Sequence, residues 1–316
     1  MLKVRGLNKT YNKLKALDAL DMNIERGSIY GLVGQNGAGK TTLMRIVSGV
    51  LSFDSGDIEI YNMDMKKQYS GIKEKIAFIP DSFAYHYNIT VEEYMEFFAS
   101  CYGFEGLRAR QRYTKLLQML SLDDKMQSLV GSLSRGMQQR LSLARALIND
   151  PEFIIMDEPT SGLDPKTNYS FKELIRQLNS EDRTILISSH MLSELSELCS
   201  DIGVIDHGHM VIESSLSDIL NKFNNTNPIK IRIMGNEDRA FKIFREDVNV
   251  RHVSARGGIF FIKFTGTKRD EAALLKKLVI EDIPVSEFMR EEAKLETFFM
   301  DITASNKERI IIENDY

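Results

Sequence analysis

Apolar and polar positions alternate at the start of the chain and predict paired strands. Within residues 1–27 the apolar positions that alternate with polar ones include Leu2, Val4, Leu7, Leu20, Met22 and Ile24. Side chains of a strand point alternately to its two faces, so a period of two is typical of strands with one buried face. We expect short strands around a turn here. Residues 28–33 then form an apolar run that leads into glycines, and residues 41–50 have a helical pattern.

Two continuous runs further along indicate a parallel sheet. Residues 153–156 and 184–187 are apolar almost without interruption, which is typical of strands buried on both faces. Residues 166–179 between them have a helical pattern, so the three segments form a βαβ unit and predict an α/β core. Residues from about 90 to 150 are expected to be mostly helical, beginning behind Thr90 as an N-cap.

A change of composition then divides the chain. Residues 221–228 are rich in asparagine and end in proline, so we interpret them as a linker after a first domain of residues 1–220. Gly257 and Gly258 indicate a hairpin. The remaining strands and helices follow a βαββαβ order, which predicts a small α+β ferredoxin-like domain. The predicted elements are 229–234, 237–245, 250–255, 259–265, 269–279 and 285–289, followed by an amphipathic segment (295–302) and a tail (303–316).

Composition sets limits on the function. The 316 residues are 43% apolar and 27% charged, as in ordinary globular proteins. A net charge of −4 argues against a protein that binds nucleic acid by neutralising many phosphates. Two cysteines without metal-type spacing fit a reducing cytosol. The charged N-terminus is unlike a signal peptide and no stretch resembles a membrane span, so another chain is expected to supply any membrane-spanning part.

The glycines after residues 28–33 form a phosphate-binding pattern, Gly34-x-x-x-x-Gly39-Lys40-Thr41. Several donors must converge on triphosphate oxygens, and glycine lets the backbone come close enough. Lys40 would reach the outer phosphates, and the Thr41 hydroxyl would ligate Mg²⁺. A glycine-rich turn is the alternative, which the strand before and the helix after disfavour. The residues assigned to ATP are Gly34, Gln35, Asn36, Gly37, Ala38, Gly39, Lys40, Thr41 and Thr42.

Two carboxylates end the apolar run of residues 153–156. Asp157 would lie at the carboxyl end of a buried strand, where it can hold Mg²⁺ through water. Glu158 is placed to polarise the attacking water as the general base. Solvated acids at a strand end are the alternative, but a phosphate loop on a neighbouring strand makes the catalytic interpretation the stronger one.

A third motif, Leu133-Ser134-Arg135-Gly136-Met137, precedes a helical stretch. Its helix N-terminus would offer backbone amides to an anion, yet it has no partner within its own phosphate site. With this motif, the order along residues 1–220 resembles the nucleotide-binding domains of ABC transporters. The Walker A loop, signature and Walker B strand are then followed by a D-loop at residues 161–164 and a switch histidine, His190.

The resemblance implies an ATPase core with an antiparallel β subdomain and a helical subdomain. It implies that Tyr11 stacks on adenine and that His190 contacts the γ-phosphate, acting with Glu158 in catalysis. Ser134 and Gly136 would close on the nucleotide held by a second subunit, either another copy of the chain or a related ATPase. The segment after Asp81 would contact the permease.

Three positions depart from the family pattern. Asp81 stands where a glutamine is usual, and its shorter side chain can still approach Mg²⁺ or its water. Arg135 replaces a signature glycine and could add charge near the phosphates or point into solvent. Met137 replaces a glutamine and loses the hydrogen bonds of its amide. The residues expected to hold Mg²⁺ and to activate water are intact, so we expect ATP hydrolysis.

Other chemical candidates are weaker. His207-Gly208-His209 could be a metal pair, but a hairpin between two short strands is the better interpretation. A group of aromatic residues could stack on bases, but helical spacing favours core positions or a surface for a partner helix. These aromatic residues are Tyr85, Tyr87, Tyr94, Phe97 and Phe98.

The sequence thus predicts the ATPase subunit of an ABC transporter, most similar to those of ABC-2-type exporters. It would be cytoplasmic, peripheral on the inner face of the plasma membrane, and would power a separately encoded permease. The alternative is a non-transport ATPase of the same family that acts on the ribosome or on nucleic acid. A binding module without catalysis is disfavoured by Lys40, Asp157 and Glu158. Residues 229–302 could serve as a dimer clamp, a regulator or a small-ligand sensor.

Overall fold

The computed structural model describes residues 1–81, 88–219 and 228–290. The chain divides into two compact units, Met1–Leu216 and Ser217–Tyr316, and each is described by itself. The predicted linker lies outside the described residues except for Pro228, as do the amphipathic segment (295–302) and the tail (303–316). No helix within the described ranges has the length and apolar character needed to cross a membrane.

The larger unit begins with an antiparallel sheet in the order β2-β1-β4-β5. Its strands are β1 (Leu2–Tyr11), β2 (Leu14–Ile24), β4 (Ser55–Ile60) and β5 (Met63–Asp64). One face is buried, since Leu2, Val4 and Leu7 of β1 are at most 2% exposed. This confirms the alternating pattern at the start of the chain.

A six-stranded sheet forms the centre of the larger unit, in the order β10-β9-β3-β8-β7-β6. The strands are β3 (Ile29–Val33), β6 (Ile76–Ile79), β7 (Phe153–Met156), β8 (Thr184–Ser189), β9 (Asp201–Asp206) and β10 (His209–Ser215). All neighbours are parallel except β9 and β10. Every residue of β3, β7 and β8 is buried. Their carboxyl ends meet at one edge of the sheet, where loops can build a site.

Helix α1 (Lys40–Val47) follows β3 and joins the two sheets. Its apolar side chains share one core with residues of both, among them Leu20 of β2 and Phe153 of β7. The helix ends before the predicted residue 50, because Gly49 turns the chain with a φ of 76°. Short α2 (Tyr69–Lys73) precedes β6.

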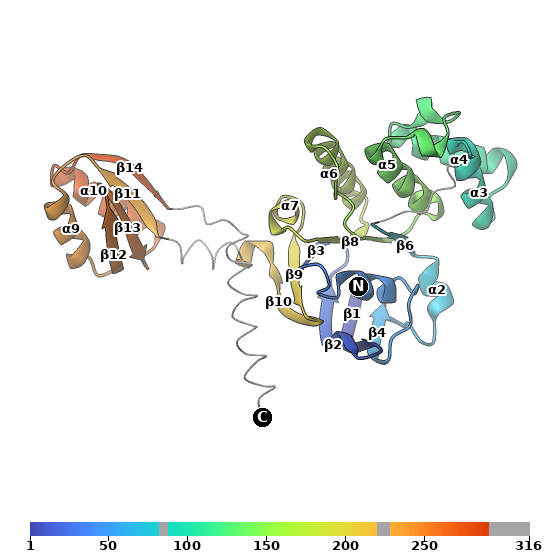
Figure 1. Cartoon of the computed structure of the whole chain (residues 1–316), viewed down its shortest axis with the longest axis horizontal. Coiled ribbons are helices and arrows are strands. Elements are labelled where there is room, and N and C mark those ends of the chain that lie inside the picture. The colour runs from blue at the N-terminus through green and yellow to red at the C-terminus, as the bar shows by residue number, and fades with distance from the viewer. Residues whose placement is uncertain (82–87, 220–227, 291–316) are drawn as a thin grey trace. The chain divides into compact units, whose positions relative to one another are not determined.

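A helical region lies against the other side of the central sheet from the antiparallel strands (Figure 1). It contains α3 (Val91–Cys101), α4 (Gly106–Met119) and α5 (Arg135–Ala146), with short 3₁₀ turns η1 (Asp123–Lys125), η2 (Val130–Ser132) and η3 (Leu147–Asn149). Thr90 caps α3 and forms a capping box with Glu93, a device worth about 1 kcal/mol. Helices α6 (Pro165–Ser180) and α7 (Leu192–Ser196) flank β8 in sequence.

The smaller unit confirms the predicted βαββαβ order. It contains β11 (Ile229–Ile233), α9 (Glu237–Glu246), β12 (Val250–Arg256), β13 (Ile259–Phe264), α10 (Lys268–Ile280) and β14 (Val285–Arg290). The sheet order is β12-β13-β11-β14, with antiparallel pairing throughout. Its core packs Ile229 and Ile231 against Phe244 and Phe260.

Candidate functional site

The phosphate loop lies between β3 and α1, and two of its glycines are required by close packing. A Cβ on Gly34 would lie 2.5 Å from the carbonyl oxygen of Ile205. A Cβ on Gly39 would lie 2.7 Å from that of Ala16, and Gly39 also has a φ of 114°. Only glycine fits at either position without moving the backbone. The loop is thus held against the carboxyl end of β9 and against β2 of the antiparallel sheet.

Exposed backbone at the tip of this loop leads directly into the N-terminus of α1. Gln35, Asn36 and Gly37 are exposed, whereas Ala38 is buried. Gly39 is the N-cap of α1 and provides no side-chain cap. The first amides of the helix therefore remain available to an anion, at the positive end of the helix dipole.

Lys40 is almost fully buried, with 6% of its side chain exposed. Its ammonium donates to the carbonyl oxygens of Gly34 at 2.7 Å and Gln35 at 3.3 Å. It also lies 3.4 Å from Glu158 Oε1. Burial of an ammonium is costly without such partners. The loop thus brings a compensated cation to the place where phosphates would bind.

Asp157 and Glu158 follow β7 and are held by Ser188 at the end of β8. The Ser188 hydroxyl donates to Asp157 Oδ1 at 2.7 Å and accepts from the Glu158 backbone N–H at 2.9 Å. Asp157 is 2% exposed. Glu158 adopts a left-handed backbone with a φ of 47°, which costs a non-glycine residue about 1–3 kcal/mol. The strained turn directs its side chain toward Lys40.

His190 completes a row of three charged or polar side chains. Its Nδ1 lies 2.9 Å from Glu158 Oε2, while Lys40 lies beside the other carboxylate oxygen. The His190 side chain is 48% exposed, so one side of the ring remains open to a ligand. The structure therefore brings together Lys40, Glu158 and His190, which come from three separate segments of the sequence.

Hard oxygen ligands for Mg²⁺ are present at the same edge. Asp157 contributes a carboxylate, and the Thr41 hydroxyl on α1 has no hydrogen-bond partner among the described residues. Mg²⁺ prefers one or two such protein oxygens and completes its shell with phosphate and water. Asp81 is exposed just beyond β6, another strand that ends at this edge. The residues present thus fit Mg²⁺.

The signature residues lie at the N-terminus of α5. Ser134 is the N-cap, and its Oγ accepts from the Met137 N–H at 3.4 Å. A Cβ on Gly136 would lie 2.4 Å from Thr167 Cγ2 of α6. Gly136 is therefore required for packing between the two helices. No hydrogen bond joins this helix end to the phosphate loop within the parts that the structure describes.

Arg135 is the first residue of α5, and its side chain lies against Gly162 in the loop that precedes α6. A Cβ added to Gly162 would be 2.5 Å from Arg135 Nη1, and Gly162 has a φ of 69°. The sequence predicted a side chain near phosphates or in solvent and did not predict this contact. It joins the signature to residues 161–164 within one chain. The sequence likewise predicted no role for Ser188, which lies two residues before His190 and holds Asp157 and Glu158 in the structure.

Tyr11 ends β1 and is 43% exposed, with Lys9 Nζ 5.7 Å from its ring centroid. An exposed ring of this kind is available for stacking.

The predicted hairpin at His207–His209 is confirmed, as β9 ends at Asp206 and β10 begins at His209. Among the described residues no three His, Cys, Asp or Glu side chains are grouped to hold a metal.

The aromatic group divides between core and surface. Tyr94 is 1% exposed and packs against Phe98 with ring centroids 4.8 Å apart, whereas Phe97 is 58% exposed. Tyr85 and Tyr87 lie outside the described residues. Core packing thus accounts for Tyr94, and Phe97 remains available to a partner.

Comparison with known proteins agrees with this geometry. The family model for ABC transporters matches residues 17–161. The bacitracin transport ATP-binding protein of Bacillus licheniformis is 32% identical over 95% of this chain and 96% of its own. A Nod factor export ATP-binding protein of Ralstonia nicotianae is 29% identical over 96% and 94%. A solved dimeric ATP-binding cassette in a post-hydrolysis state with ADP and Pi has a TM-score of 0.63 and 27% identity, covering 68% of this chain and 99% of that one.

Proposed function

The chain belongs to the ABC transporter family as an ATP-binding, ATP-hydrolysing subunit, and we propose that it powers export through a separately encoded membrane permease. One observation carries the proposed chemistry: Glu158 lies between Lys40 and His190, at 3.4 Å and 2.9 Å. A carboxylate in this place can accept a proton from the water that attacks the γ-phosphate. His190 would fix the orientation of that carboxylate and contact the phosphate.

The nucleotide would bind along residues 34–42, with Tyr11 against adenine and Lys40 on the outer phosphates. Thr41 and Asp157 would hold Mg²⁺, which supplies charge neutralisation for the phosphates. Asp81 would lie close to this ion or its water. Ser188 would keep Asp157 in place, because its hydroxyl donates to Oδ1.

Two nucleotide-binding domains would share each ATP. Ser134 and Gly136 at the start of α5 would face the γ-phosphate bound by a second copy of the chain or by a related ATPase. Support comes from the backbone amides of Arg135 and Gly136, which the Ser134 cap leaves open, and from the similarity to a dimeric cassette. ATP would hold the dimer closed, and hydrolysis would allow it to open.

The permease would dock beside the segment that follows Asp81 and on the helical region. A groove of about 1040 Å³ lies at the amino end of β6, the opposite end of that strand from Asp81, and borders the end of α3. Its lining includes Val50 of the turn after α1 and Phe78 of β6, with Tyr102 after α3. Docking on the helical region is supported by the exposed ring of Phe97 on α3. The chain would accordingly be peripheral on the inner face of the plasma membrane.

Export is favoured over import because relatives such as the Nod factor export protein are named for export. The transported compound would be selected by the permease. Residues 229–302 would form an accessory domain in addition to the ATP-binding domain. Purification from membranes tests the proposal: a polytopic membrane protein should co-purify with the chain. Fractionation with ribosomes, without a membrane partner, would instead support the non-transport alternative.

A further inference from the structure

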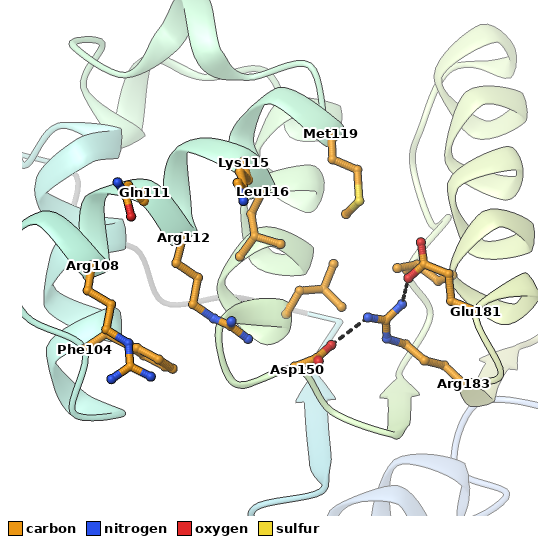
Figure 2. Close-up of a pocket in the computed structure, with 12 residues that line it drawn as sticks. Phe104, Arg108, Gln111, Arg112, Lys115, Leu116, Met119, Asp150, Glu181 and Arg183 are labelled. Atoms are coloured by element: carbon orange, nitrogen blue, oxygen red, sulfur yellow. Dashed lines mark hydrogen bonds and ion pairs between the residues drawn. The ribbon is translucent and has the colours of Figure 1, made fainter.

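A cavity lies beside α4, away from the nucleotide site. Its volume is about 360 Å³, within the range of small-molecule sites. Figure 2 shows the side chains of α4 on one side and the ion-paired Asp150, Arg183 and Glu181 on the other. Arg183 directly precedes β8, and Asp150 precedes β7. The cavity is therefore at the amino ends of these strands, whereas the phosphate loop and Glu158 are at the carboxyl ends.

Three cations on one face of α4 line the cavity. Arg108, Arg112 and Lys115 are four and three residues apart, so they are neighbours on the helix surface, where like charges repel. None of the three has a carboxylate partner among the described residues. The guanidinium groups of Arg108 and Arg112 lie 5.2 Å and 4.8 Å from the Phe104 ring centroid, and Arg112 also donates to the Ile148 carbonyl.

The opposite side of the cavity does not neutralise these charges. Arg183 Nη2 forms an ion pair with Asp150 Oδ1 at 2.7 Å, and Glu181 pairs with the same guanidinium. Both carboxylates share this one cation, so this side keeps a net charge of −1 against the three positive charges of α4. The N-terminus of α4, one turn from Arg108, adds the positive end of the helix dipole. The α4 side of the cavity therefore has excess positive charge.

The lining changes from charged to apolar along α4. Leu116 and Met119 follow the cations on the helix, and the buried Leu147 and Leu178 also line the cavity. With a rise of 1.5 Å per residue, the distance along the helix from Arg108 to Met119 is roughly 16 Å. The site is thus elongated, with a cationic end and an apolar end.

We propose that this cavity binds a small amphipathic anion, a carboxylate or phosphate on an unbranched apolar chain. The anionic group contacts Arg108, Arg112 and Lys115, where it relieves their mutual repulsion. The chain packs on the half-buried Leu116 and Met119, which removes its own apolar surface and part of theirs from water. A volume of about 360 Å³ accommodates one such molecule and is too small for a partner helix. The site is separate from the residues assigned to ATP.

Calorimetric titration of the full chain with octyl phosphate, below its micelle concentration, tests the proposal. Octyl phosphate should bind at one site per chain, and each methylene removed from its chain should weaken binding about fourfold. Inorganic phosphate should bind at least tenfold more weakly, because it lacks the chain. Octylamine should not bind, because it has the wrong charge. Equal binding of inorganic phosphate or of octylamine would overturn the proposal.

Substitutions then locate the site. The double variant Arg108→Gln, Lys115→Gln should bind octyl phosphate about tenfold more weakly. Arg110→Gln is the matched control, since Arg110 is on the same helix but pairs with Glu92 at 3.5 Å and does not line the cavity. The control should bind as the unchanged chain does. Thermal unfolding establishes that all variants are folded, and a double variant with unchanged affinity would contradict the assignment.

Discussion

Lys40 Nζ lies 3.4 Å from Glu158 Oε1, so the cation assigned to the outer phosphates is paired with the carboxylate assigned to activate water. The two side chains are only 6% and 15% exposed, and buried charges require such compensation. A triphosphate that enters the loop would bring its own negative charge to Lys40. It would thereby release Glu158 from the ion pair, with His190 still 2.9 Å from its other oxygen. Nucleotide binding itself would then prepare the base.

Ser188 links the metal ligand to the base, because it donates to Asp157 Oδ1 and accepts from the Glu158 N–H. Ser188→Ala would leave both of these groups without that partner. We expect ATP turnover to fall about tenfold to a hundredfold, with a higher Mg²⁺ concentration for half-maximal rate. Steady-state rates of ATP hydrolysis, measured at increasing Mg²⁺ concentrations, check this prediction. Ser189→Ala is the control, since that hydroxyl donates to Glu194 instead; the same Mg²⁺ requirement in both variants would contradict the role of Ser188.

The contact between Arg135 and Gly162 predicts a measurable coupling. Gly162→Ala should destabilise the chain by about 1–2 kcal/mol. Residue 162 has a left-handed backbone, and the added Cβ would lie 2.5 Å from Arg135 Nη1 and displace that guanidinium. Arg135→Ala removes the displaced group, so the double variant should recover part of that loss while the backbone part remains. Urea unfolding of the four chains measures the coupling. Strictly additive effects would show that the two residues are not in contact.

Glu93 makes the stability of α3 depend on pH. Its hydrogen bonds with the backbone and side chain of Thr90 hold its pKa below the ordinary value of 4.5. The carboxylate therefore stabilises the folded chain fully above pH 4.5, and this contribution is lost as the pH falls through the lowered folded-state pKa. The melting temperature of Glu93→Ala should be below that of the unchanged chain at pH 7, and the difference should narrow in acid.

Glu93→Gln is the control for that experiment. Its amide oxygen can still accept from the Thr90 N–H but does not titrate. The difference between Glu93→Gln and Glu93→Ala should therefore stay constant with pH. A difference between the unchanged chain and Glu93→Ala that does not narrow below pH 4.5 would rule out the cap as its source.

Much of the fold could be predicted because local chemistry and tertiary structure agree. Uninterrupted apolar runs predicted β7 and β8 as strands buried on both faces, and the paired glycines after β12 predicted its hairpin with β13. Gly34 and Gly39 were predicted to let the backbone approach phosphates, and the structure adds that the chain's own backbone crowds both positions. These features depend on residue type and on order along the chain, which are visible in one sequence.

Other features depend on which side chains meet after folding. The contact of Arg135 with Gly162 joins two segments that are far apart in the sequence and share no pattern. A serine such as Ser188 looks the same in a sequence whether it bridges two acids or faces solvent. The cavity beside α4 forms only because that helix packs in a particular position against η3 and the end of α6. Such relations follow from three-dimensional packing, so the sequence alone did not predict them.

Replacement of Glu158 tests the account most directly. Glu158→Gln keeps the shape of the side chain but removes its ability to accept a proton, so ATP turnover should fall at least a hundredfold. ATP should still bind, and ATP-bound dimers should accumulate in size-exclusion chromatography. Glu173→Gln, an acid of α6 that pairs with Arg176, should leave turnover within about twofold, as expected of an exposed surface pair. Normal turnover in Glu158→Gln would contradict the assignment of Glu158 as the base.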